Sequence, residues 1–235
     1  MSGTTFEGTI DWDEHWREIT DGEREYSNPS EALLLDALRE FLTERGPPES
    51  YADVGCGPGT AAFDVADRYP DAAVVGYDAA EPVLDANRER AAEEGAENVC
   101  FEQAILPEFD PDRQFDVVSA CYVLCYVEDT ERALRTLYDA VAPGGDLVLT
   151  YHNRYARAVF RKIAESPHEH LDEGDAWDPE HFADRFELVL SGESLLSYGR
   201  IHDVLGAWPQ SVWSVADGAE RYRAWRHNPF VFVPK

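Results

Sequence analysis

The feature that most constrains the fold is a regular alternation of short apolar strands and helices, which starts at residue 51. Predicted strands occupy residues 51–54, 73–77, 99–101, 115–120 and 146–151, and predicted helices occupy residues 29–45, 60–69, 81–94 and 130–141. Alternating elements of these lengths are typical of a parallel sheet with helices on both faces. The sequence therefore predicts an α/β fold.

The last third of the chain has a less regular pattern. Residues 155–164 are predicted as a helix, and residues 186–190 and 230–233 are predicted as strands. No linker rich in Gly, Ser or Pro separates this part from the predicted sheet. We therefore predict a single domain over residues 1–235.

The chain carries 47 acidic and 20 basic residues, which gives a formal net charge of −27. Residues 1–50 hold −9 of this charge, residues 51–150 hold −15, and residues 151–235 hold only −3. A dense acidic surface with only two lysines favours a protein of a salt-loving organism over an ordinary acidic protein, because charge repulsion opposes association. The charge also argues against a nucleic-acid partner, which requires a row of Lys and Arg side chains.

No apolar run is long enough to span a bilayer, and no basic start precedes an apolar segment, so we expect a cytoplasmic protein without a membrane partner. The four cysteines Cys56, Cys100, Cys121 and Cys125 lack zinc-type pairing and are expected as small buried apolar side chains or reduced thiols. The His168-Glu169-His170 segment is interpreted as a solvated acidic loop, because its spacing fits no coordination geometry. No metal site is expected.

A glycine-rich segment, Asp53 to Gly59, lies between the first predicted strand and its helix. Glycines allow a tight turn and a close approach of the backbone to a ligand. Asp78 follows 19 residues after Gly59 and ends the second predicted strand. A carboxylate there can bind both ribose hydroxyls of an adenosine, and the carboxyl edge of a parallel sheet is where ligands bind.

The details of the loop distinguish two cofactor classes. Dinucleotide enzymes use the spacing GxGxxG, which places a pyrophosphate on the helix N-terminus. Here the spacing is GxGxG with Pro58 inside it. Asp53 would repel a pyrophosphate but attract a cationic amino group. The residues therefore favour S-adenosylmethionine over a nicotinamide dinucleotide.

The motifs DVGCGPG, GYD, FDVVSACYVL and APGG follow one another within residues 28–152. This ordered set resembles the class I S-adenosylmethionine-dependent methyltransferase family. The resemblance implies a Rossmann-like three-layer sandwich with a seven-stranded, mostly parallel sheet of order 3-2-1-4-5-7-6, whose last strand is antiparallel. Residues 186–190 and 230–233 would then form the sixth and seventh strands. The implied divisions are an N-terminal helical cap at 1–50, a cofactor-binding core at 51–152, and a substrate-side cap with the final strands at 153–235.

The resemblance also implies which residues bind the cofactor. They are Asp53, Gly55, Cys56, Gly57, Gly59, Asp78, Ala79, Gln103, Ala104, Cys121, Tyr122 and Tyr26. Asp53 would hold the amino group of the methionine moiety, and Asp78 would bind the ribose. The acid that relatives often carry after the third strand is missing, so the side chain of Gln103 or the backbone of Ala104 would contact the adenine.

Methyl transfer from a sulfonium is a direct displacement, so alignment supplies most of the catalysis, and a base is needed only if the acceptor must lose a proton. His152 and Tyr126 are the candidate catalytic residues near the expected carboxyl edge. His152 has the ordinary pKa best suited to a base, although a structural hydrogen bond is the commoner role for such a residue. Asn153, Arg154 and Tyr155 are the candidate substrate contacts.

All seven histidines and all six tryptophans lie outside residues 51–150. The aromatic residues of the flanks would form a substrate chamber, stack on a cationic acceptor, or simply pack the cap onto the sheet. Two groups of basic residues, at 154–162 and 221–226, either pair with nearby acids or attract an anionic acceptor.

We therefore expect a monomeric or homodimeric enzyme that methylates an N or O atom of a small molecule, with S-adenosylhomocysteine as the product. An anionic acceptor is compatible with the charge distribution, because residues 151–235 carry a net charge of only −3. The alternatives are a non-catalytic S-adenosylmethionine-binding or regulatory protein and an RNA methyltransferase. A nicotinamide-dependent oxidoreductase is the least supported reading.

Overall fold

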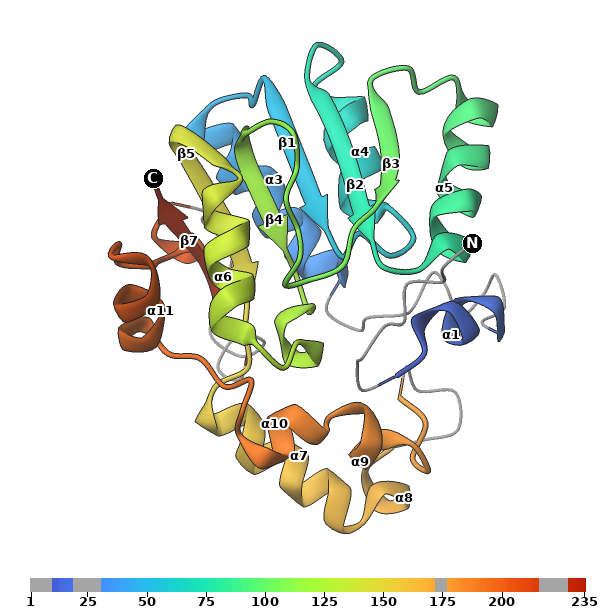
Figure 1. Cartoon of the computed structure of the whole chain (residues 1–235), viewed down its shortest axis with the longest axis vertical. Helices are drawn as coiled ribbons and strands as arrows, with labels where there is room; N and C mark the ends of the chain where they lie inside the picture. Colours follow the sequence, from blue (N-terminus) through green and yellow to red (C-terminus); the bar gives the residue numbers. More distant parts are fainter. Residues whose placement is uncertain (1–9, 19–30, 172–176, 216–227) are drawn as a thin grey trace.

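The computed structural model describes residues 10–18, 31–171, 177–215 and 228–235, and a mixed β-sheet lies at its centre (Figure 1). The described strands form one seven-stranded sheet of order β3-β2-β1-β4-β5-β7-β6. They are β1 (Ser50–Val54), β2 (Ala73–Asp78), β3 (Val99–Gln103), β4 (Phe115–Ala120), β5 (Val141–Thr150), β6 (Gln210–Ser211) and β7 (Phe230–Pro234). The first five strands are parallel, and β7 is antiparallel to both β5 and β6. The predicted strand order is confirmed.

Helices cover both faces of the sheet, as predicted (Figure 1). One face is covered by α3 (Glu31–Arg45), α4 (Thr60–Arg68) and α5 (Glu81–Glu94), and the other by α6 (Thr130–Asp139) and α11 (Tyr198–Leu205). Phe41 and Leu84 are buried on the first face, and Leu134 and Ile201 on the second. Burial of apolar side chains on both faces explains why the central strands read as nearly continuous apolar runs. The predicted helix start at Asn28 and Pro29 lies outside the described residues.

The prediction of a strand at residues 186–190 is wrong. This segment forms α10 (Glu187–Ser191), which follows α9 (Phe182–Arg185), and the sixth strand is Gln210–Ser211 instead. Phe186 and Val189 are buried three positions apart, which is helical spacing. A short apolar run such as FELVL does not distinguish a strand from a buried helix by its periodicity.

The fifth strand is longer than predicted. The strand was predicted to begin at residue 146, but β5 begins at Val141 and includes the Pro143-Gly144-Gly145 segment. The pairing of β4 with β5 changes register between Phe115 and Val117, so the glycines occupy an irregularity within the strand. Glycine in a strand often marks such a bulge.

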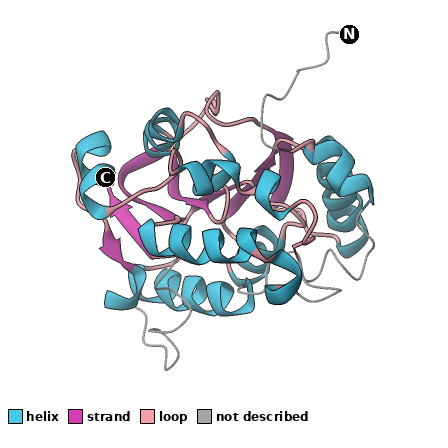
Figure 2. Cartoon of the chain, turned by 90° about the horizontal axis from the view of Figure 1, so that it is seen from below, coloured by secondary structure: helices cyan, strands magenta, loops and turns pink. Residues whose placement is uncertain are grey.

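A third group of helices lies beyond the carboxyl ends of the parallel strands, in the lower part of Figure 1. This cap consists of α1 (Trp12–Glu18), α7 (Arg154–Glu165), α8 (Pro167–His170), α9 and α10. Figure 2 views the molecule from the side of these helices, with the sheet behind them. They bury a cluster of their own, which consists of Cys125, Phe160, Leu171, Phe182, Phe186 and Val189. We call it the cap cluster.

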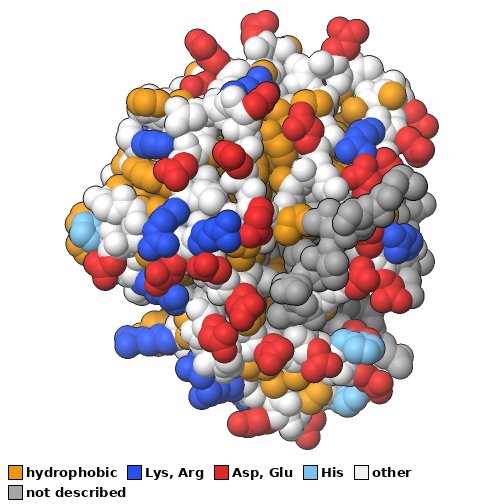
Figure 3. Space-filling view, in the orientation of Figure 1, with side chains coloured by type: hydrophobic (Ala, Val, Ile, Leu, Met, Phe, Trp, Pro, Cys, Tyr) orange, Lys and Arg blue, Asp and Glu red, His pale blue; other side chains and the backbone are white. Residues whose placement is uncertain are grey.

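Acidic side chains and arginines alternate over the visible face in Figure 3. Arg39 and Asp64 approach to 2.6 Å, and Arg45 pairs with the buried Asp146 at 2.8 Å, which links α3 to β5. In the predicted basic group at 154–162, Arg157 Nε donates to the carbonyl of Leu190 at 3.0 Å, so this side chain joins α7 to α10. No helix in the described part of the chain is long and apolar enough to cross a membrane.

Candidate functional site

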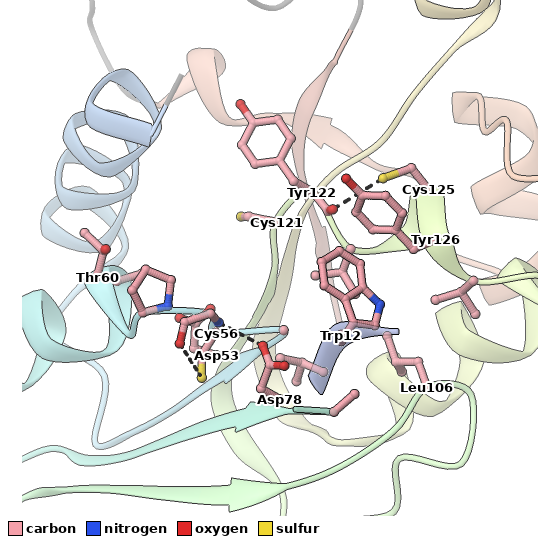
Figure 4. A pocket seen from close by; sticks show the side chains of 18 of the residues that line it. Trp12, Asp53, Cys56, Thr60, Asp78, Leu106, Cys121, Tyr122, Cys125 and Tyr126 are labelled. Carbon is pink, nitrogen blue, oxygen red and sulfur yellow. Dashed lines mark hydrogen bonds between the residues drawn. The ribbon is translucent and has the colours of Figure 1, made fainter. Parts of the chain in front are cut away.

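A cavity of about 250 Å³ opens where the carboxyl ends of the parallel strands meet the cap (Figure 4). Two groups of side chains face it. The glycine-loop wall consists of Asp53, Gly55, Cys56, Gly57, Asp78 and Ala79. The aromatic wall consists of Trp12, Tyr126, His152, Trp177, Arg185 and Phe186. The first wall comes from β1, β2 and the loops that follow them, and the second comes mainly from the cap.

The glycine loop is shaped by positive φ angles. Gly55, Gly57 and Gly59 have φ angles of 75°, 49° and 75°, a region that L-residues rarely adopt. The backbone N–H groups of Gly55 and Cys56 both donate to the carbonyl of Tyr77, at 2.7 and 2.9 Å. A Cβ atom on Gly55 would overlap the side chain of Val123. The loop therefore needs glycine for both its conformation and its packing.

The Gly57 peptide is held on both sides by buried side chains. Its N–H donates to Asp78 Oδ2 at 2.9 Å, and its carbonyl accepts from Asn87 Nδ2 at 2.8 Å. The second oxygen of Asp78 accepts from the N–H of Ala80 at 3.0 Å. Burial raises the pKa of Asp78, while the backbone donors of Ala80 and Gly57 oppose that shift. An ionised carboxylate has about four lone-pair positions, so the backbone donors of Gly57, Ala80 and Ala79 leave Asp78 acceptor capacity for a ligand hydroxyl.

Asp53 is only 5% exposed and is oriented by a short chain of hydroxyls. Ser119 Oγ donates to Asp53 Oδ1 at 2.7 Å, and the hydroxyl of Tyr51 lies 2.7 Å from the same Ser119 oxygen. Burial raises the pKa of Tyr51 well above its ordinary value, so its hydroxyl keeps its proton. These bonds place a fixed carboxylate at the end of β1, where it faces the cavity.

Nine of the twelve predicted cofactor positions line the cavity: Asp53, Gly55, Cys56, Gly57, Asp78, Ala79, Ala104, Cys121 and Tyr122. Gly59 is not among the lining residues and packs against Phe63 at the start of α4. Gln103 is exposed, and its side-chain Nε2 donates to the carbonyl of Ala79 at 2.9 Å, so the structure does not bring this side chain into the cavity. Tyr26 lies outside the described residues.

Both predicted catalytic residues line the cavity. His152 is 5% exposed, and its ring lies 5.0 Å from that of Phe160. Burial lowers the pKa of His152 to about 4, which disagrees with the expectation of a base poised near neutral pH. Tyr126 accepts a hydrogen bond from Arg185 Nε at 3.3 Å, and burial raises its pKa. Both side chains are therefore neutral near pH 7.

The three predicted substrate contacts lie at the start of α7 and are not among the residues that line the cavity. The side-chain oxygen of Asn153 accepts from the N–H groups of Tyr155 and Ala156, at 2.8 and 3.1 Å. Asn153 is thus the N-cap of a helix, the commonest role of Asn before a helical segment. Tyr155 is half exposed, and the guanidinium of Arg154 lies over its ring. Their role as substrate contacts stays a prediction.

His15, Arg185 and Phe186 line the cavity but were not predicted as site residues. Trp12 and Trp177, which also line it, belong to the six flanking tryptophans for which a substrate chamber or packing of the cap was predicted. Arg185 belongs to no motif, so nothing in the sequence distinguished it from the other arginines.

The aromatic wall is built from ring contacts. The rings of Trp12 and Tyr126 meet edge to face at 4.8 Å, and those of Tyr126 and Phe186 stack at 5.8 Å. The guanidinium of Arg185 lies 5.9 Å from the centre of each of these three rings. Burial, and secondarily Arg185, lower the pKa of His15 to about 4.

Within the described residues, no cluster of His, Cys, Asp and Glu side chains could hold a metal ion. The predicted loop at residues 168–170 is instead the short helix α8, with both histidines exposed. All four cysteines are free, as predicted. The cavity therefore presents two carboxylates on one wall and one guanidinium among aromatic rings on the other.

The sequence of the chain is similar to those of known methyltransferases. The model of a methyltransferase domain matches residues 52–147. A trans-aconitate 2-methyltransferase from Variovorax paradoxus is 35% identical over 175 residues, which are 71% of this chain and 60% of that protein. The same enzyme from Methylobacterium radiotolerans is 32% identical over 139 residues, which are 59% of this chain and 49% of that protein. The chain thus spans about half the length of the curated relatives that it matches.

Solved structures show the same architecture. The N-methyltransferase NodS from Bradyrhizobium japonicum, in complex with S-adenosyl-L-homocysteine, superimposes with a TM-score of 0.63. The match covers 97% of this chain and 98% of the other at 17% sequence identity. At this identity the likeness concerns the fold, which the two chains share over almost their whole lengths.

Proposed function

Because the chain belongs to the class I S-adenosylmethionine-dependent methyltransferase family, we propose that its cavity binds S-adenosylmethionine and directs methyl transfer to a small molecule. The observation that carries this proposal is the glycine-loop wall. A tight loop with positive φ angles stands beside two buried carboxylates at the carboxyl edge of the sheet. This is where open α/β sheets bind their ligands.

The residues of this wall fit the cofactor. The side chain of Val123 fills the position that a Cβ atom of Gly55 would take, and Gly55 and Gly57 line the cavity without a side chain of their own. Asp53 is a buried carboxylate positioned for a cationic amino group, and Asp78 has lone pairs left for ribose hydroxyls. Ala79 and Ala104 line the cavity next to Asp78, where the adenine would lie. When bound, the cofactor supplies a methyl group on a sulfonium: the acceptor lone pair bonds to the methyl carbon as the carbon–sulfur bond breaks, which leaves S-adenosylhomocysteine.

The other residues of the cavity orient the acceptor and exclude water. Trp12, Tyr126 and Phe186 form a continuous aromatic surface opposite the glycine loop. His152 and Tyr126 are neutral near pH 7, and a histidine with a pKa of about 4 is a weak base. The wall therefore suits an acceptor whose N or O lone pair is already available, and rate enhancement would come mainly from alignment.

The acceptor itself is the finer part of this proposal. Relatives named trans-aconitate 2-methyltransferase make trans-aconitate the first compound to test. The chain spans only about half of their length. The shared cofactor-binding motifs therefore do not assign the substrate of these relatives to this chain. A protein that binds the cofactor without turnover is the alternative, and the experiment below separates the two.

Calorimetry at low and at molar salt is expected to show binding of S-adenosylmethionine and no preference for NADH. The Asp78→Asn variant keeps the shape of the side chain but loses the charge, so the cofactor Kd is expected to rise by about tenfold or more. Asp71→Asn, at an exposed position of the turn before β2, is the matched control and should bind normally. Equal affinity in the Asp78 variant, or preferential NADH binding, would contradict the proposal.

Turnover is measured as the release of S-adenosylhomocysteine in the presence of trans-aconitate and a panel of other small molecules. Release that depends on one acceptor supports the enzyme. Tight cofactor binding without release for any member of the panel supports the non-catalytic alternative.

A further inference from the structure

We propose that Arg185 anchors a carboxylate of the acceptor, so that the cavity selects small organic acids. This inference rests on the proposed function, because it assigns the acceptor class for the same cavity. It is carried by the position and the hydrogen bonding of the guanidinium.

Arg185 is the last residue of α9 and lines the cavity. Its Nε donates to the hydroxyl of Tyr126 at 3.3 Å. In the described ranges no carboxylate lies within 4.0 Å of its guanidinium, whereas Arg39, Arg45 and Arg88 each form an ion pair. A guanidinium has five N–H donors in a planar fork that matches a carboxylate. Among the described residues, Arg185 forms one hydrogen bond, to Tyr126, which leaves four of these donors for a ligand.

The aromatic rings do not form a cage for a cationic acceptor. The guanidinium of Arg185 already lies 5.9 Å from the ring centres of Trp12, Tyr126 and Phe186. Cation–π attraction therefore acts between these rings and a cation of the protein itself. A second cation here would be repelled by the first. The remaining ring surface is suited to the carbon skeleton of an acceptor whose charge is negative.

The distribution of charges around the cavity also favours an anionic acceptor at the aromatic wall. Asp53 and Asp78 lie on the glycine-loop wall, where the cofactor would bind. His15 on α1 and His152 after β5 both have pKa values lowered to about 4 by burial, so both are uncharged near pH 7. Among the described lining residues, Arg185 thus supplies the positive charge of the aromatic wall. A positive side chain at this cavity, in a chain of net charge −27, attracts an anion to the aromatic wall.

An ionised acceptor also removes the need for a strong base. If a carboxylate oxygen is methylated, its lone pair forms the oxygen–carbon bond as the carbon–sulfur bond breaks. No proton is transferred in this step, and the product is an ester. The weak basicity of His15 and His152 is then compatible with turnover.

The experiment measures the binding of trans-aconitate to the chain saturated with S-adenosylhomocysteine, by calorimetry. In Arg185→Gln the Kd is expected to rise by about tenfold or more, because hydrogen bonds to a charged group are lost. Arg185→Lys keeps the charge but not the fork, so it should retain part of the affinity. Arg161→Gln, on the exposed side of α7, is the matched control and should bind as the unmodified chain does. The trimethyl ester of the probe should bind poorly to all of them.

Equal binding of trans-aconitate to the Arg185→Gln variant, or preferential binding of choline, would overturn the inference. A panel of mono-, di- and tricarboxylates guards against an unsuitable probe, and failure of every member to bind would also overturn it. Binding of S-adenosylhomocysteine to each variant is measured first. If the unmodified chain does not bind S-adenosylhomocysteine, the proposed function is contradicted. If it binds S-adenosylhomocysteine but no carboxylate, only the role of Arg185 is contradicted.

Discussion

The two walls of the cavity are built in different ways. Every residue of the glycine-loop wall lies between positions 53 and 79, and backbone hydrogen bonds fix the loop. The aromatic wall brings together Trp12, Tyr126 and Arg185, which are distant in the sequence, and contacts between side chains hold it in place. The first wall is a local motif, and the second exists only after the cap has packed. Cofactor binding and acceptor binding should therefore respond to different substitutions.

The largest effect is expected from the cap cluster. The ring of Phe160 lies 4.7 Å from that of Phe186 and 5.5 Å from that of Phe182, measured between centres. Phe160→Ala should lower the free energy of unfolding by about 3–5 kcal/mol because it leaves a cavity in a buried cluster. If the two walls are independent, the affinity for S-adenosylhomocysteine should not change while the protein remains folded.

Urea unfolding and calorimetry measure the two quantities on the same sample. Phe160→Leu is the matched control and should lose less stability, since it removes fewer buried atoms. A parallel loss of cofactor affinity in the folded Ala variant would show that the walls are coupled.

The next effect comes from the opposite wall. Gly55→Ala places a Cβ atom against Val123 and forces a non-glycine residue into a φ of +75°. Together these should cost about 2–4 kcal/mol of stability, and cofactor affinity should fall because the loop must move. Adding Val123→Ala should recover the steric part of the loss and leave the backbone part.

Gly95 provides the matched control for this substitution. It has a φ of +67°, and a Cβ atom there would meet nothing within 4 Å. Gly95→Ala should therefore show the backbone cost alone, without any change in cofactor affinity. If both variants lose the same stability, the contact with Val123 does not constrain the loop.

The smallest effect is a difference in pH response between the walls. Burial lowers the pKa of His152 to about 4, so below pH 6.5 the unfolded state binds a proton that the folded state does not. Its contribution to stability is therefore lost as the pH falls towards 4, by about 2 kcal/mol at pH 5. Burial shifts the pKa of Asp78 upward, so acid acts on that group in the opposite direction and favours the folded state.

Urea unfolding at pH 7 and pH 5 tests the histidine part. The stability of His152→Gln should fall less with acid than that of the unmodified chain. His168→Gln, at an exposed position of α8, should behave as the unmodified chain. The same pH dependence in His152→Gln and the unmodified chain would mean that the ring is not held neutral by burial.

The sequence predicts most of the sheet and most of the glycine-loop wall, because both follow from short contiguous patterns. The positive φ angles of Gly55 and Gly57 and the place of Asp78 at the end of β2 are of this kind. The apolar run at residues 186–190 was misread as a strand, since helix and strand share that pattern over so few residues. The side chain of Gln103 was predicted in the cavity, but it turns to a backbone carbonyl instead.

Arg185 shows the limit of such reasoning. Its role depends on being next to Tyr126 and Trp12, and no spacing in the sequence indicates that neighbourhood. Asn153 shows the converse, because the sequence suggested a substrate contact and the structure shows the local role of a helix cap. Local chemistry is readable from sequence, whereas the partners of a side chain depend on tertiary packing.

The hydrogen bonds that Asp78 and Asn87 form with the Gly57 peptide have a consequence for the kinetics of cofactor binding. Asp78 and Asn87, which both belong to the chain itself, hold the N–H and the carbonyl of this peptide. The loop therefore has its curvature before a cofactor arrives, and binding would not incur the entropy of ordering it. Association should then be limited by diffusion into the cavity beneath the cap, and differences in affinity between cofactor and product should appear as differences in their residence times.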